Sequence, residues 1–127
     1  ALATVIVDYT DVVIAVPDQM KEEVYARIEA MGTPMEYIHS YPCASDDTWA
    51  RDHGPITVET DGVFKLLDFQ FNGWGNKFPH AQDNQISKVL FNQDAFPHAV
   101  FEEQDWVLEG GSIETDGQGT LLTTSSC

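Results

Sequence analysis

The sequence predicts an α/β fold made of about two strand-helix-strand-hairpin repeats, and three observations predict it. First, an apolar β-branched run, a helical pattern and a second extended stretch follow one another between residues 11 and 39. Second, Asp61-Gly62 and Asp116-Gly117 are hairpin turn signals between later strands. Third, placing Trp49 over Trp106 aligns several further positions at one offset, so the unit occurs twice.

The first half of the chain begins with an ambiguous segment. Residues 2–9 could form a helix end or a strand, whereas residues 11–16 are typical of a buried strand. Asp18 can cap a helix that runs to Met31, with Met20 and Met31 on its apolar face and Gly32 at its end. A second strand is expected at 35–39, and a polar loop comes after it.

The second half of the chain repeats this order. The pattern predicts hairpin strands at 56–58 and 63–71, then a glycine-rich loop at 71–76 with an exposed indole. This loop is either a lid over a site or a plain surface loop, and we favour the surface loop. Asp83 is a candidate cap for a helix through Phe91, whose Ile86, Val89 and Leu90 share an apolar face, and strands are expected at 99–101 and 120–124. The two repeats then cover about residues 11–69 and 66–124.

Composition limits the classes of partner. The chain has 127 residues, 43% of them apolar, and a formal net charge of −15. This charge opposes nucleic acid, whose phosphates it would repel, and suits a cationic substrate, although acidic surfaces also serve solubility alone. No apolar run approaches the roughly 20 residues of a membrane span. No signal-peptide pattern is present either, so we expect a cytoplasmic protein that does not bind membranes.

Metal and cofactor sites are not expected. The four histidines are scattered, and the two cysteines, Cys43 and Cys127, form no ligand pair such as Cys-x-x-Cys. Phosphate-binding and dinucleotide-binding glycine motifs are absent from the sequence. We therefore expect no cofactor, and interpret both cysteines as buried or incidental thiols. The sequence leaves the oligomeric state open, including a homo-oligomer of the full-length protein.

Two aligned acids, Asp52 and Glu109, are the candidate site residues. If the repeats surround an axis, both acids face a common centre, where carboxylates repel each other unless a cation lies between them. A guanidinium has the planar shape that carboxylates bind in bidentate fashion. Trp49 would stack on that cation or belong to the core, and Gly110 would let a ligand approach the backbone or merely permit a bulge. Asp52 could instead pair with Arg51 or cap the turn at Gly54.

Three stretches resemble the agmatine deiminase and bacterial peptidylarginine deiminase family: DTWARDHGP at 47–55, FNGWG at 71–75, and VLEGGSIE at 107–114 with LLTT at 121–124. The resemblance implies a partial α/β-propeller (pentein) of the guanidine-modifying superfamily, which has five such repeats around a pseudo-five-fold axis. It implies a hydrolase that converts agmatine to N-carbamoylputrescine and ammonia, a step of polyamine biosynthesis, through a covalent cysteine intermediate. The alternatives are a peptidylarginine deiminase, an amidinotransferase or a non-catalytic binding protein of the same fold.

The resemblance also assigns roles to residues. Asp52 would bind the guanidinium, Trp49 would shape the pocket, and Glu109 would lie near the catalytic histidine. The family's histidine belongs to a His-x-Asp motif, and its cysteine lies near the end of a much longer chain. No histidine here is followed two residues later by aspartate, and neither Cys43 nor Cys127 stands where the nucleophile is expected. We therefore expect the first half of such an enzyme, inactive by itself.

Overall fold

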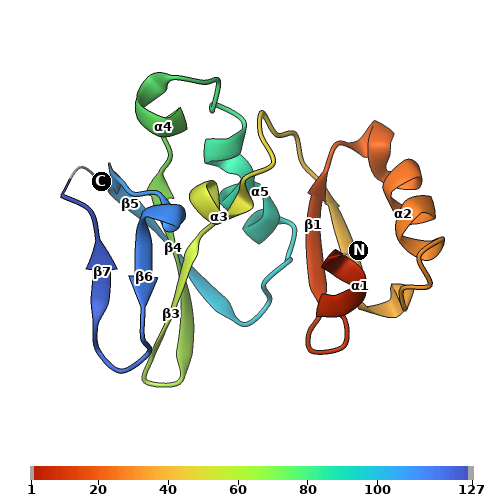
Figure 1. Cartoon of the computed structure of the whole chain (residues 1–127), viewed down its shortest axis with the longest axis horizontal. Helices are drawn as coiled ribbons and strands as arrows, with labels where there is room; N and C mark the ends of the chain where they lie inside the picture. The colour runs from red at the N-terminus through yellow and green to blue at the C-terminus, as the bar shows by residue number, and fades with distance from the viewer. Residues whose placement is uncertain (1, 126–127) are drawn as a thin grey trace.

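The computed structural model describes residues 2–125, which form two neighbouring groups of strands with helices around them (Figure 1). The first group consists of α1 (Leu2–Ile6), β1 (Val12–Val16), α2 (Lys21–Glu29) and β2 (Ile38–Pro42), with short 3-10 turns η1 (Asp18–Met20) and η2 (Met35–Tyr37). β1 pairs with β2 in parallel. A parallel pair needs a crossover connection, and α2 supplies it.

The second group is a three-stranded sheet followed by a separate hairpin. Its elements are α3 (Ala50–His53), β3 (Ile56–Thr60), β4 (Val63–Gln70), α4 (Gly73–Asn76), η3 (Asp83–Gln85), α5 (Ile86–Asn92), β5 (Ala99–Val107), η4 (Gly110–Ser112), β6 (Ile113–Thr115) and β7 (Leu121–Thr123). The strand order is β3-β4-β5, with β3 antiparallel and β5 parallel to β4. The predicted α/β class is therefore confirmed.

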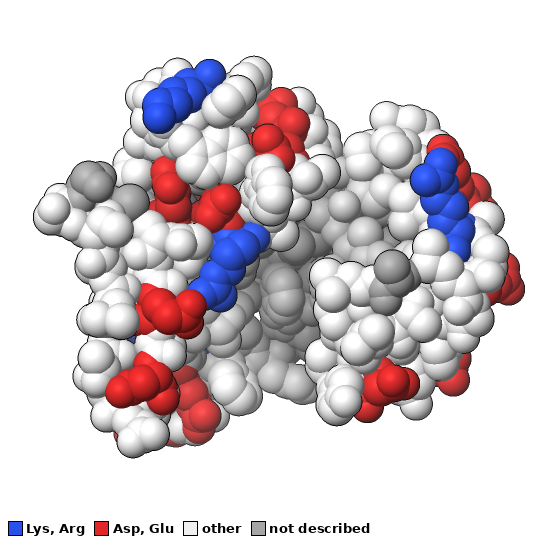
Figure 2. Space-filling model, in the orientation of Figure 1, with Lys and Arg blue, Asp and Glu red and all other residues white. Residues whose placement is uncertain are grey.

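The buried core joins the two groups through α5. Its centre is Cys43, Ile86 and Leu90, against which side chains from β1 and β2 also pack. The predicted apolar face of this helix is confirmed. Beside the core, residues of β1, α3 and α5 line a hollow of about 400 Å³. Figure 2 shows a hollow between the two groups and acidic side chains over both of them.

The two hairpins differ in their loops. Asp61-Gly62 forms the predicted two-residue turn, with Thr60 opposite Val63 and positive φ angles of 53° and 77°. In the second hairpin Thr115 pairs with Leu121, so the loop is longer. The sequence alignment of the two repeats places Ile56 over Ile113, and Leu66-Leu67 over Leu121-Leu122. In the structure Ile56 pairs with Leu67, whereas Ile113 pairs with Thr123. The return strands are therefore offset by one residue from that alignment.

Several predicted boundaries in the first group are wrong. Asp18 does not cap α2, because it lies in η1 and the N-cap position of α2 is Met20. The predicted strand at 35–39 begins as the turn η2, and β2 extends to Pro42 through the expected loop. Met20 and Met31 are 46% and 54% exposed, so the two ends of the predicted apolar helix face are not buried. The ambiguous first segment is helical.

Asp83 is also misassigned by the sequence pattern. It lies in η3, while the N-cap position of α5 is Gln85 and makes no side-chain capping bond. The Asp83 carboxylate is turned instead toward the loop before α3, where it accepts backbone hydrogen bonds. No helix within residues 2–125 is both long and apolar enough to cross a membrane. Cys127 lies outside the described residues.

Candidate functional site

The candidate site forms where α3 meets η4. These two short turns pack so closely that a side chain at either glycine of η4 would collide with α3. A Cβ atom on Gly110 would overlap the backbone carbonyl oxygen of Arg51, and one on Gly111 would overlap Oδ1 of Asp52. Glycine is therefore needed at position 110 for the Asp52 turn to lie against the loop that carries Glu109, whereas a side chain at position 111 would displace the flexible Asp52 carboxylate.

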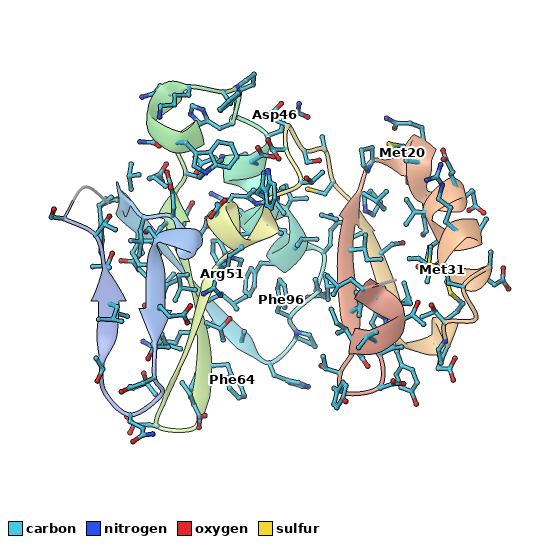
Figure 3. The ribbon with its side chains drawn as sticks, viewed as in Figure 1. Met20, Met31, Asp46, Arg51, Phe64 and Phe96 are labelled. Carbon is cyan, nitrogen blue, oxygen red and sulfur yellow. The ribbon has the colours of Figure 1, made fainter. Side chains whose placement is uncertain are left out.

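The Asp52 carboxylate neither pairs with Arg51 nor caps the turn at Gly54, the two structural roles that the sequence left open. Arg51 donates from its guanidinium to the carbonyl of Ile113 at 3.5 Å, and Figure 3 shows its side chain reaching away from α3. The turn amide of Gly54 donates to the carbonyl of Ala50 at 2.9 Å. Within residues 2–125, the Asp52 carboxylate has no hydrogen bond or salt bridge.

Glu109 borders a hollow of about 520 Å³ beside this contact. Asn72, Trp74, Gly75, Lys77, Val107, Leu108 and Glu109 line it. The pKa of the Glu109 carboxyl is raised, first by its partial burial and then by the negative charge of Asp52, while Lys77 acts in the opposite direction. The two acids are therefore close enough to repel each other, which is the arrangement that a bound cation would relieve.

The glycine-rich loop contributes more than the sequence indicated. Asn72 accepts a hydrogen bond from the amide of Gly75 at 2.8 Å, and Trp74 adopts a positive φ of 57°. The Trp74 ring contacts Phe71 and Phe78 edge-on, at centroid distances of 5.0 and 5.7 Å. The predicted exposed indole is therefore wrong, because Trp74 is half-buried against these two rings, and the loop lines the hollow next to Glu109.

Lys77 is the lining residue that sequence reasoning missed. Only six lysines and arginines occur in the chain, against 21 aspartates and glutamates. A lysine placed directly after the glycine-rich loop was therefore a signal that could have been noticed. Within residues 2–125, Lys77 forms no salt bridge, and its charge acts on Glu109 across the hollow.

Trp49 does not join the acids in this structure. Its indole is 63% exposed, so it is not a core residue, and it does not line the hollow beside Glu109. Trp49 instead precedes α3, and its carbonyl accepts a hydrogen bond from the amide of Asp52 at 2.9 Å. The structure thus brings together Asp52, Glu109 and Gly110, and leaves the tryptophan at the rim of the turn.

Potential nucleophiles and bases lie elsewhere. Cys43 is buried, and burial, together with the charge of Asp83, raises the pKa of its thiol. His53 is buried against Phe71, and its two ring nitrogens have no hydrogen-bond partner among the described residues. Within residues 2–125, no three histidine, cysteine, aspartate or glutamate side chains gather as a metal site would require.

Comparison with known proteins identifies the class. The family model of Porphyromonas-type peptidyl-arginine deiminases matches residues 1–127, and the chain belongs to this family. The agmatine deiminase of Pseudomonas syringae pv. tomato is 33% identical over 100% of this chain and 34% of its own length. An agmatine deiminase of Pseudomonas aeruginosa is 41% identical over 66% of this chain and 24% of its own length.

Solved structures agree with these relatives. An agmatine deiminase of C. jejuni with substrate bound superposes with a TM-score of 0.80 at 33% identity, over 99% of this chain and 35% of that chain. The agmatine deiminase of Enterococcus faecalis gives a TM-score of 0.79 at 32% identity, over 99% of this chain and 34% of that chain. The chain thus spans about a third of the length of the relatives that it matches.

Proposed function

We propose that this chain supplies the guanidinium-binding part of a deiminase that acts on agmatine. The observation that carries the proposal is the contact between α3 and η4, which brings two acids together without ion-pair partners among the described residues. The charge of Asp52 raises the pKa of the Glu109 carboxyl, and the Asp52 carboxylate lies against Gly111, the neighbour of Gly110. The similarity to agmatine deiminases supports the same substrate class.

In this proposal the acids bind and orient the substrate. Asp52 accepts hydrogen bonds from the guanidinium nitrogens, and Glu109 balances the remaining positive charge. A cysteine thiolate outside residues 1–127 attacks the guanidinium carbon and forms a C–S bond. A histidine donates a proton to the departing ammonia, and then activates the water that breaks the C–S bond to give the ureido product. Trp49 is proposed to close over the substrate as part of the pocket wall.

The proposed architecture is the α/β-propeller of the guanidine-modifying superfamily. Each parallel pair, β1 with β2 and β4 with β5, is followed by an antiparallel hairpin, which supports repeats at about 11–69 and 66–124. Cys43 is a free thiol, which suits the reducing cytoplasm that we propose as its location. We also propose a homo-oligomer of the full-length protein that binds no nucleic acid.

A second candidate function is deimination of arginine in peptides. The name of the matching family model favours it. Both substrates present the same guanidinium to the acids, and they differ in the group at the far end of the aliphatic chain. Agmatine ends in an ammonium, which the net charge of −15 would attract. Turnover of agmatine and of an arginine-containing peptide, compared on one enzyme preparation, separates these candidates.

The test is the Asp52→Asn substitution in the full-length protein. The change keeps the shape of the side chain and removes its charge, and a hydrogen bond to a charged group contributes about 1.5–3 kcal/mol. Since about 1.4 kcal/mol equals a factor of ten, we expect kcat/KM on agmatine to fall about tenfold or more. The melting temperature should stay unchanged, because the Asp52 carboxylate makes no hydrogen bond or salt bridge within residues 2–125.

Asp61→Asn is the matched control. It makes the same chemical change at the tip of the first hairpin, where asparagine also tolerates the positive φ of 53°. This variant should keep wild-type kinetics and stability. Wild-type efficiency for Asp52→Asn would remove Asp52 from the site, whereas a collapsed melt would give it a structural role.

A further inference from the structure

Two adjacent residues of η3, the turn just before α5, each bind a different loop. Asp83 is completely buried, and its Oδ1 accepts hydrogen bonds from the amides of Asp46 and Asp47 at 2.7 and 3.0 Å. The next residue, Asn84, accepts a hydrogen bond through Oδ1 from the amide of Phe71 at 2.7 Å. The two loops are thus attached to neighbouring positions on one turn.

Each attachment is reinforced by a second set of bonds. Asp46 accepts hydrogen bonds from the backbone amide and the side-chain amide of Gln82, at 2.9 and 2.8 Å. Asn84 donates through Nδ2 to Oε1 of Gln70 at 3.1 Å. Figure 3 shows Asp46 above α5, beside the segment that leads down to α3. The contacts therefore fix both the position and the direction of each loop.

The two loops lead into two parts of the candidate site. Asp46 and Asp47 are followed by Thr48 and Trp49, and then by the α3 turn that carries Asp52. Phe71 comes directly before the loop at 72–77, which lines the hollow beside Glu109. The two loops are therefore linked to each other through η3, and none of the η3 residues is among those that line the hollow beside Glu109.

Fold stability alone gives a poor account of Asp83. Burying a carboxylate is costly unless its oxygens are satisfied, and Oδ2 of Asp83 has no partner among the described residues. Helix α5 does not use Asp83 as a cap. A buried acid of this kind is explained if the backbone amides that it binds need a fixed position.

We propose that Asp83 and Asn84 are positioning residues, which set the distance between the Asp52 turn and the Trp74 loop. The proposal rests on the proposed function for the reaction that this spacing serves. Small displacements of a substrate-binding group reduce catalysis strongly, by about a hundredfold for an error near 1 Å. Loosening either attachment should therefore lower turnover, although neither residue touches the hollow.

The first test measures hydrogen exchange of backbone amides, by mass spectrometry, in the protein at the length that its gene encodes. Asp83→Ala should speed exchange at Asp46 and Asp47 by about tenfold or more, and leave Phe71 unchanged. Asn84→Ala should do the reverse. Gln85→Ala is the matched control, because this exposed neighbour on the same turn makes no side-chain hydrogen bond in the structure, and it should change neither loop.

The second test measures turnover of agmatine by the same variants. Both alanine variants should lower kcat about tenfold or more, and Gln85→Ala should not. Asp83→Asn and Asn84→Asp keep an acceptor oxygen and should restore most of the exchange protection and of kcat. Restoration by these variants distinguishes positioning from general loss of stability, and keeps the test decisive if Asp83→Ala does not fold.

Three results have different meanings. Unchanged exchange in both alanine variants would overturn the attachment of the loops, and freed loops with wild-type kcat would overturn their positioning role. A wild-type protein that turns over no guanidinium compound would instead overturn the proposed function. In that case the exchange pattern, with the affinity for agmatine measured by calorimetry, still decides whether the pair positions the site.

Discussion

At the scale of single residues, the two glycines of η4 control different things. The side chain that Gly110 excludes would meet the backbone of α3, whereas the one that Gly111 excludes would meet the end of the flexible Asp52 side chain. A backbone atom cannot move without its neighbours, but a carboxylate can rotate away. Substitution of the first glycine therefore acts on the fold, and substitution of the second acts on the site.

We predict that Gly111→Ala lowers the affinity for agmatine about tenfold or more with little change in the melting temperature, because it displaces the Asp52 carboxylate. Gly110→Ala should lower the melting temperature clearly, since α3 and η4 must separate. Calorimetric titration and a thermal melt on both variants measure this. Equal affinity for wild type and Gly111→Ala would mean that the Asp52 carboxylate does not contact the ligand.

A second prediction concerns the charge of Glu109. Its carboxyl pKa is raised by burial and by Asp52, and is lowered by Lys77. Asp52→Asn should therefore lower the Glu109 pKa, and Lys77→Met should raise it. Carbon NMR titration of the Glu109 carboxyl measures both shifts, with Glu59→Gln on the exposed edge of β3 as the control that leaves it unchanged.

The same shift fixes the direction of the pH dependence. An acid whose pKa is raised in the folded protein stays protonated to higher pH than an ordinary glutamate. Guanidinium binding needs the ionised form, so affinity for agmatine should fall as the pH drops through the raised pKa of Glu109. Lys77→Met should move this loss of affinity to higher pH. If the pH midpoint of agmatine binding is the same in wild type and Lys77→Met, Lys77 lies too far from Glu109 to affect its pKa.

At the scale of elements, α5 connects the two groups of strands. Its buried residues Ile86 and Leu90 pack with Cys43, and side chains of β1 and β2 complete the cluster. The turn just before this helix carries the attachments of the two site loops. Helix α5 therefore packs against both groups of strands, and the turn before it binds the two loops that lead to the candidate site.

We predict that Leu90→Ala lowers the free energy of unfolding by about 2–5 kcal/mol, the usual range for a buried leucine. The side chain is 7% exposed. Val100→Ala on β5 is the control, because Val100 is 46% exposed and should cost far less. Denaturation by urea measures both. A small effect of Leu90→Ala would mean that the groups do not depend on the α5 contact.

At the scale of the whole molecule, the last strands are poorly covered. Trp106 on β5 and Leu121 and Leu122 on β7 are 58%, 62% and 66% exposed, although Trp106 contacts Phe69 edge-on. Within residues 2–125, β6 and β7 pair only with each other. In the proposed propeller, a further repeat would pack over these apolar side chains, which gives them a reason to be apolar.

We predict that residues 1–127 alone release no ammonia from agmatine above a no-protein control. The reaction needs a thiolate within reach of the guanidinium carbon, and Cys43 is buried in the core with a raised thiol pKa. A coupled ammonia assay measures this. Release that disappears with Cys43→Ala or Cys127→Ala would identify a nucleophile within the chain and contradict the prediction.

The sequence by itself determined the elements with strong local signals. The β-branched run before Pro17, the two-residue Asp61-Gly62 turn and the apolar face of α5 depend on side-chain patterns and backbone preferences within a few residues. The proximity of Asp52 to Glu109 could also be predicted, because each acid precedes a glycine and a hairpin. These features are local, or repeat a local pattern, so one chain suffices to recognise them.

Only the tertiary structure decided which partners the polar side chains chose. Asp18 and Asp83 both resemble helix caps in sequence, yet Asp18 caps nothing and Asp83 binds amides that are 36 and 37 residues away. The sequence did not indicate the ring contact between Trp74 and Phe71, because Trp74 adopts a positive φ that its residue type does not predict. A short polar side chain has similar hydrogen-bonding options in many contexts, and burial selects among them only when the chain has folded.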